Sequence, residues 1–132
     1  MRGRLVIAAA VGMFMSASLS AHHGSAAYDN GKVVILKGAV VQWVYSNPHC
    51  LLTVDVKGDD GSVVRWIAET QAPNIMYPAG YRKDSFKVGD EVTVNVEPVK
   101  NGLPVARIRE VVLADGTTLG GVGSVPTPPK SK

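Results

Sequence analysis

Apolar and β-branched residues fill a long stretch from Val33 to Tyr45, which has no proline and one central glycine, Gly38. Such side chains favour extended structure, so the stretch predicts one long strand. A glycine inside a strand indicates a bulge or a sharp bend, and we expect one at Gly38. A bent strand of this length can pair with one neighbour at its start and another at its end.

Period-two alternation of apolar and polar residues continues after this stretch. It predicts four further strands, at residues 50–56, 63–69, 91–97 and 106–113. The inward positions include Cys50, Leu52, Val54 and Val56. Between residues 70 and 89 the alternation disappears, and Pro73 there predicts the first position of a short helix.

Five strands, the first long and bent, with a short helical segment between the third and fourth, predict an all-β fold. The order is typical of a five-stranded barrel like the oligonucleotide/oligosaccharide-binding (OB) fold. A small β-sandwich is the alternative. We expect the barrel domain to cover residues 22–118 and a disordered tail rich in glycine and proline to cover residues 119–132.

Residues 1–21 have the plan of a secretory signal peptide. Two arginines, Arg2 and Arg4, precede an apolar run that is too short for a stable membrane span. We therefore expect a periplasmic or secreted protein. Cleavage after Ser20 and cleavage after Ala21 both fit the pattern, and the sequence leaves the choice open.

Charge and cysteine content narrow the possible functions. The 132 residues carry a formal charge of +3, and subtracting Arg2 and Arg4 leaves +1. Positive and negative residues are interleaved, which disfavours nucleic acid as a partner. The single cysteine, Cys50, excludes an intramolecular disulfide, and we expect it to be a small buried apolar residue.

Histidines supply the strongest chemical signal. If cleavage follows Ser20, the new amine, two amide nitrogens and His23 form a square-planar set suited to Cu(II) or Ni(II). If cleavage follows Ala21, the amine and imidazole of His22 can chelate the ion, with His23 or His49 as a third ligand. We therefore predict a copper-type metal ion, with His22, His23 and His49 as ligands. The alternatives are adventitious binding at the terminus and a purely structural role for His49.

A second candidate site lies where the third predicted strand ends, because strand ends and loops carry function more often than strand centres. Its predicted ligand-binding residues are Trp66, Glu69, Asn74 and Tyr77. An envelope protein or a small ligand is the expected partner. In the structural alternative, Trp66 is a core aromatic, and Glu69 is an acidic residue at the helix entry or pairs with Arg65 or Arg82.

The chain resembles a family of small exported bacterial proteins of unknown function. The matching residues are His22-His23-Gly24, Leu36-Lys37-Gly38, Asn47-Pro48-His49, Trp66, Glu69, Pro73-Asn74, Gly80, Lys87 to Val92 and Leu113 to Gly116. Tyr81 stands where the family has a tryptophan. The resemblance implies no activity.

The sequence contains no nucleophile elbow, no His-Glu-x-x-His or Cys-x-x-Cys motif and no phosphate-binding glycine loop. We therefore expect an exported binding module and not an enzyme. The alternative is a structural or accessory envelope protein, and a metal-dependent oxidoreductase is a third possibility.

Overall fold

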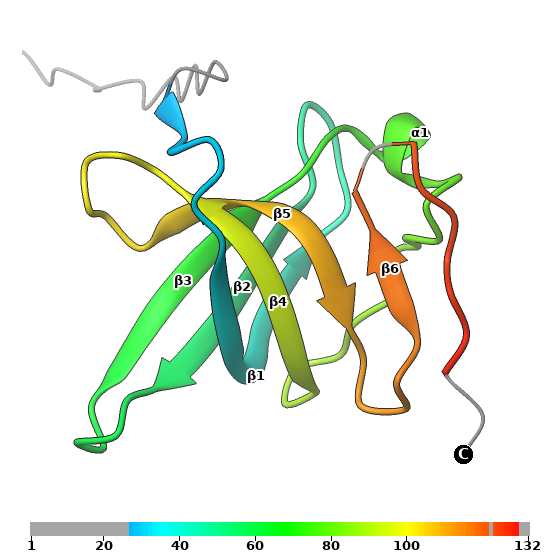
Figure 1. Ribbon diagram of the computed structural model, residues 1–132. Coiled ribbons are helices and arrows are strands. Elements are labelled where there is room, and N and C mark those ends of the chain that lie inside the picture. The colour runs from blue at the N-terminus through cyan, green and yellow to red at the C-terminus, as the bar shows by residue number, and fades with distance from the viewer. Residues whose placement is uncertain (1–26, 122, 130–132) are drawn as a thin grey trace, which may run out of the picture.

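The computed structural model describes residues 27–121 and 123–129, which form a small β-structure with one short helix (Figure 1). The elements in chain order are β1 (Val34–Val44), β2 (Leu51–Lys57), β3 (Val63–Glu69), α1 (Pro73–Met76), β4 (Glu91–Pro98), β5 (Val105–Val112) and β6 (Thr118–Gly120). The first five strands match the predicted ranges to within one residue at each end.

Strands β1 to β5 form a closed barrel. Hydrogen-bonded neighbours follow the order β3-β2-β1-β4-β5, and these pairs are antiparallel. The barrel closes through a parallel pair between β3 and β5, in which Ile67 lies opposite Val105 and Glu69 opposite Arg107. The prediction of an all-β, five-stranded OB-like barrel with a short helix between β3 and β4 is confirmed.

The long first strand pairs with two neighbours, as its length predicts. Its residues 34–39 pair with β4 and its residues 38–44 pair with β2. Gly38 lies in the overlap, where a Cβ atom would collide with the backbone oxygen of Asp55. The change of register that we expected at Gly38 occurs later, between Val40 and Gln42, so Val41 is the extra residue of the bulge.

The interior of the barrel is filled by the inward side chains of β1 to β5. These include Leu36, Val40, Leu52, Val54, Ala68, Val92, Val94, Val96, Ala106, Ile108 and Val111, all of them buried. Trp43 and Phe86 pack edge to face against this core, with their ring centres 4.9 Å apart. Removal of this apolar surface from water is the main source of stability for a domain without a disulfide.

Helix α1 begins at Pro73, where the missing N–H costs no helical hydrogen bond. Its last residue, Met76, is fully buried and anchors the helix to the core. The chain from α1 to β4 then follows an irregular course, as the loss of alternation predicts.

Strand β6 is not predicted by the sequence pattern, because three residues are too few for a periodic signal. It pairs antiparallel with β5, and its central residue Leu119 is buried. Residues 119 and 120, which we assigned to a disordered tail, belong to this strand. Further along, Thr118 and Thr127 exchange backbone hydrogen bonds of 2.8 and 2.9 Å, so residues near 127 run beside β6.

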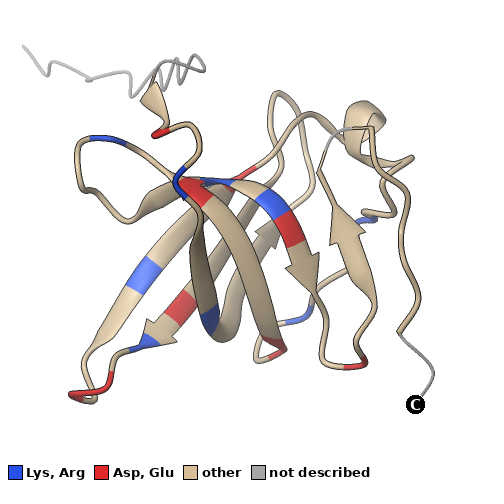
Figure 2. Cartoon of the chain, viewed as in Figure 1, with Lys and Arg blue, Asp and Glu red and all other residues tan. Residues whose placement is uncertain are grey.

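Charged residues of both signs are mixed over the described chain (Figure 2). On the outer surface of the β2–β3 hairpin, for example, Arg65 lies directly opposite Asp55, and its Nε is 2.8 Å from Oδ1. This mixing agrees with the interleaving of charges in the sequence.

Candidate functional site

The outer surface of the barrel carries a row of polar side chains along the closing seam between β3 and β5. Ala68 and Cys50 are fully buried, so the alternation of side chains along a strand directs their neighbours Glu69 and His49 outward. Arg107 lies opposite Glu69 across the seam. The start of β2, the end of β3 and the start of β5 thus meet in one outward-facing cluster.

The imidazole of His49 contacts the carboxylate of Glu69 through Nδ1 and Oε1. Nδ1 itself is buried, whereas 38% of the His49 side chain is exposed. We assign the imidazole proton to Nδ1, because an N–H group there satisfies the facing carboxylate. In the neutral ring, the free lone pair is then on Nε2, where it can bind a metal ion.

Tyr28 holds the second oxygen of the same carboxylate. Its hydroxyl donates a hydrogen bond of 3.0 Å to Oε2 of Glu69, and the residue is buried. Burial, followed by the charge and the hydrogen bond of Glu69, raises the pKa of the Tyr28 hydroxyl well above its usual value, and Arg107 offsets only part of the rise. The phenol therefore remains protonated at neutral pH and keeps its role as a donor.

Arg107 connects Tyr28 with the end of β4. Its guanidinium carbon lies 4.8 Å from the centre of the Tyr28 ring, and its Nε donates a 3.0 Å hydrogen bond to Oε2 of Glu97. Its Nη2 reaches the same oxygen and also Oδ1 of Asn30, at 3.2 Å. Glu97 is buried, and its other oxygen lies 3.6 Å from Nη1 of Arg109. One buried carboxylate is thus shared by two arginines.

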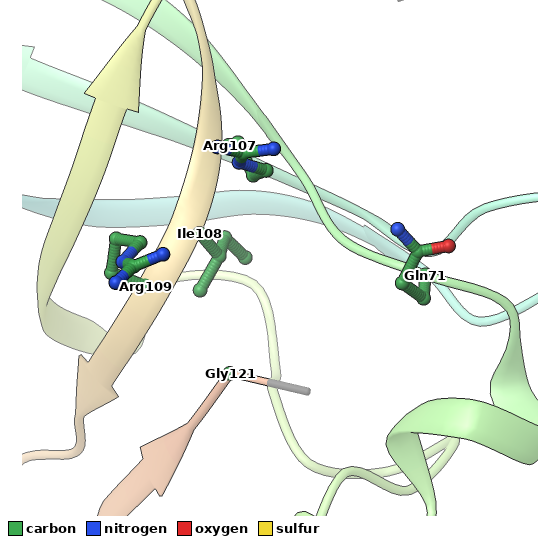
Figure 3. A pocket seen from close by; sticks show the side chains of 5 residues that line it. All are labelled: Gln71, Arg107, Ile108, Arg109 and Gly121. Atoms are coloured by element: carbon green, nitrogen blue, oxygen red, sulfur yellow. The ribbon is translucent and has the colours of Figure 1, made fainter. Parts of the chain in front are cut away.

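A depression of about 370 Å³ opens beside this row (Figure 3). Three of its lining residues, Arg107, Ile108 and Arg109, come from β5. Gln71 follows the end of β3, and Gly121 follows the end of β6. Its volume lies in the range of sites for small molecules.

The four predicted ligand-binding residues do not share one place in the fold. Glu69 lies in the seam, whereas Trp66 is half-buried and packs against the core. Asn74 is exposed on α1. Tyr77 is 56% exposed, and the guanidinium carbon of Arg82 lies 3.5 Å from the centre of its ring.

Of the three predicted metal ligands, His49 lies in the described part of the chain, whereas His22 and His23 lie outside it. Within residues 27–121 and 123–129, no three side chains of histidine, cysteine, aspartate or glutamate converge to hold a metal ion. Cys50, directly before β2, is fully buried, whereas 38% of the side chain of its neighbour His49 is exposed, and burial raises the pKa of the Cys50 thiol. A protonated, buried thiol is a poor metal ligand.

Sequence reasoning missed Tyr28, Glu97, Arg107 and Arg109. The spacing of the two arginines along one predicted strand was a usable signal, because strand alternation tends to place residues two apart on one face. No local signal marks Tyr28, whose partner Glu69 lies 41 positions away in the sequence.

Comparison with known proteins finds a match to one family model, described as a family of unknown function (DUF6152), over residues 11–106. The matched range includes Tyr28, His49 and Glu69 and ends one residue before Arg107. Searches of curated proteins and of solved structures found no match. Among the described residues, no helix is long and apolar enough to cross a bilayer.

Proposed function

The chain belongs to this family of unknown function (DUF6152), whose model covers 11–106 of its 132 residues, and from its own site we propose an exported binding module for a copper-type ion. The nitrogen ligands in this proposal are His22, His23 and His49. Export rests on the signal peptide predicted at residues 1–21, and the role is binding, not catalysis. The observation that carries the proposal is the contact between Glu69 and His49.

Glu69 orients His49 in the way that suits a metal ligand. In metal sites, a ligating imidazole commonly donates its second N–H to a carboxylate, which fixes both the ring and its tautomer. Nδ1 of His49 faces Glu69 in this manner, and Tyr28 holds the other carboxylate oxygen. Because Nδ1 is buried and the ring is partly exposed, the remaining nitrogen, Nε2, is the one offered to an ion.

Chain length supports the participation of the amino-terminal histidines. The backbone beside Tyr28 is held to the barrel, with Asp29 N donating to the Pro98 oxygen at 2.8 Å. His23 precedes Tyr28 by five residues, and five residues span at most about 17 Å. The hydroxyl of Tyr28 and the ring of His49 contact the same carboxylate. His49 therefore lies within the reach of the five-residue segment between Tyr28 and His23.

Each predicted cleavage would complete a different ligand set. A chain that begins at Ala21 offers its amine, two amide nitrogens and His23 to Cu(II), whereas a chain that begins at His22 offers its amine and that imidazole. In either case His49 could add a further nitrogen ligand. Mass spectrometry of the exported protein identifies the true first residue.

Titration of the purified exported protein with Cu(II) tests the proposal. We expect one ion per chain and an affinity about tenfold higher than that of a synthetic peptide with the same first eight residues, because His49 adds a pre-oriented ligand. His23→Ala should abolish tight binding by a chain that begins at Ala21 and weaken binding by a chain that begins at His22. A protein that binds no more tightly than the peptide would refute the proposal.

Variants of the seam separate an ordered site from a flexible terminus. Glu69→Gln should lower the affinity for Cu(II) about tenfold, as changes to carboxylate partners of ligating histidines do. Glu91→Gln, an exposed glutamate at the start of β4, is the matched control and should leave the affinity unchanged. Equal affinities for the two variants would show that Glu69 has no part in the site.

A second candidate function is recognition of an envelope protein or a small ligand near α1. Ile75 on α1 and Tyr77 directly after it favour this candidate, because their large side chains are 42% and 56% exposed. A pull-down from envelope extract, with and without a metal chelator, separates the two functions. Loss of a partner with Tyr77→Ala but not with chelator supports this candidate, and the reverse result supports copper.

A further inference from the structure

We infer that the depression beside β5 binds the oxyanion group of a small molecule, a carboxylate or a phosphate, through Arg107 and Arg109. This site is separate from the proposed copper site, because its cationic side chains repel a metal ion. Its lining residues do not include His49 or Glu69. Four observations carry the inference: a gap in strand pairing, a bulge, two arginines as the charged lining residues, and a suitable volume.

The gap lies along the edge of β5. This strand pairs with β3 as far as Arg107 and with β6 from Glu110 onward, so Ile108 and Arg109 lie between the two described partners on that edge. Gly121 follows β6 at one end of the gap, and a Cβ atom there would come within 3.2 Å of the backbone oxygen of Arg109. A glycine at this position therefore avoids crowding the gap.

A bulge in β5 places the second arginine at the gap. Ile108 pairs with Val96 and Glu110 pairs with Asn95, which makes Arg109 the extra residue between two consecutive positions of β4. A bulge redirects the side chain of the extra residue, and bulges recur beside functional sites for this reason. Arg109 is 58% exposed, and its approach to Glu97 at 3.6 Å is longer than a hydrogen bond.

The charged side chains that line the depression are both cationic. Of its five lining residues, Arg107 and Arg109 carry a charge, and their guanidinium groups share the buried carboxylate of Glu97. Glu69 and Glu110 also carry negative charge, but they do not line the depression: Glu69 contacts Tyr28 and His49, and Glu110 accepts a 2.7 Å hydrogen bond from Asn95. An anion in the depression would therefore meet two guanidinium groups and no lining carboxylate.

Hydrogen-bond donors at the depression are available for such a group. Arg107 uses Nε and Nη2 for Glu97 and Asn30, and its Nη1 has no hydrogen-bond partner among the described residues. Arg109 has a guanidinium free of hydrogen bonds to the described chain, and the carboxamide of Gln71 lines the same space. Planar guanidinium groups bind carboxylates and phosphates through paired hydrogen bonds. The volume of the depression, about 370 Å³, is large enough for a small molecule that carries such a group.

Titration of the metal-free exported protein with sodium succinate and, separately, with sodium phosphate tests the inference by NMR, with ionic strength held constant by chloride. We expect saturable binding of at least one anion, with shifts of the Gln71 side-chain amide. Saturation by succinate alone identifies a carboxylate site, and saturation by phosphate alone identifies a phosphate site. Absence of saturation by both anions would overturn the inference.

Arg109→Gln should weaken the binding about tenfold, the effect of one charged hydrogen-bond partner. Arg65→Gln is the matched control, because Arg65 is also an exposed strand arginine paired with a carboxylate but lies away from the depression. It should leave the affinity unchanged. Equal weakening by the two variants would reduce the effect to general charge attraction and overturn the inference. Copper-free protein keeps the result independent of the proposed metal site.

Discussion

Glu69 and Arg107 are register partners in the parallel pair that closes the barrel, yet their charged groups have different partners. Glu69 contacts His49 and Tyr28, whereas Arg107 contacts Glu97 on β4. The two proposed sites therefore meet at one seam, whose strands are far apart in the sequence. Because the depression is lined by Gln71 after β3 and by arginines of β5, this second site forms only when the barrel closes.

Replacing Glu97 should destabilise the barrel. Glu97→Ala removes the buried acceptor of Arg107 and leaves an unsatisfied cation, so the free energy of unfolding should fall by about 2 kcal/mol. The loss stays below that of a fully buried pair, because 29% of the Arg107 side chain is exposed. Denaturant unfolding measures the change. Asp55→Ala removes the partner of Arg65, whose side chain is 62% exposed, and should have little effect, so equal losses would contradict the prediction.

Gly38 should tolerate no side chain. In Gly38→Ala the new Cβ would overlap the backbone oxygen of Asp55, and β1 and β2 would have to separate. The cost should exceed that of Gly61→Ala, where the backbone has a positive φ of 83° but the space around Cβ is empty. Thermal unfolding of both variants ranks the costs. A smaller loss at position 38 than at position 61 would show that the two strands adjust freely.

Alkaline pH should unfold the protein through its buried tyrosines. Burial raises the pKa of Tyr28 and that of Tyr81 in the folded state. Their contribution to stability is therefore complete below the unfolded pKa of about 10 and is lost as pH rises toward the folded values. Unfolding measured from pH 8 to pH 11 should show a steeper decline for the natural chain than for Tyr28→Phe, which has one such proton fewer. Parallel declines would contradict the raised pKa of Tyr28.

More of the fold than of the site could be predicted from the sequence. The pattern that defines a strand is local, whereas the contacts that form the site join residues far apart in the sequence. Each strand of the barrel has a local pattern of its own, so β1 to β5 could be predicted without knowledge of their partners. His49 and Glu69 were assigned to different sites, because their contact depends on the register that places Leu51 opposite Glu69. Tyr28 depends on a partner even further away, and β6 is too short to have a pattern.

His49 and Cys50 are neighbours in the sequence, but their substitution should have different effects on the affinity for Cu(II) and on the protection of the thiol. Cys50 is fully buried, and burial raises the pKa of its thiol, so a thiol reagent should modify it only after unfolding. Cys50→Ala should cost about 1 kcal/mol of stability through lost packing and leave the affinity for Cu(II) unchanged. His49→Gln should instead lower that affinity and leave the thiol protected. Reagent kinetics with and without denaturant, together with Cu(II) titration of both variants, measure these outcomes. Copper binding that is lost with Cys50→Ala, in a variant that still unfolds cooperatively, would move the metal site from the outer seam to the core.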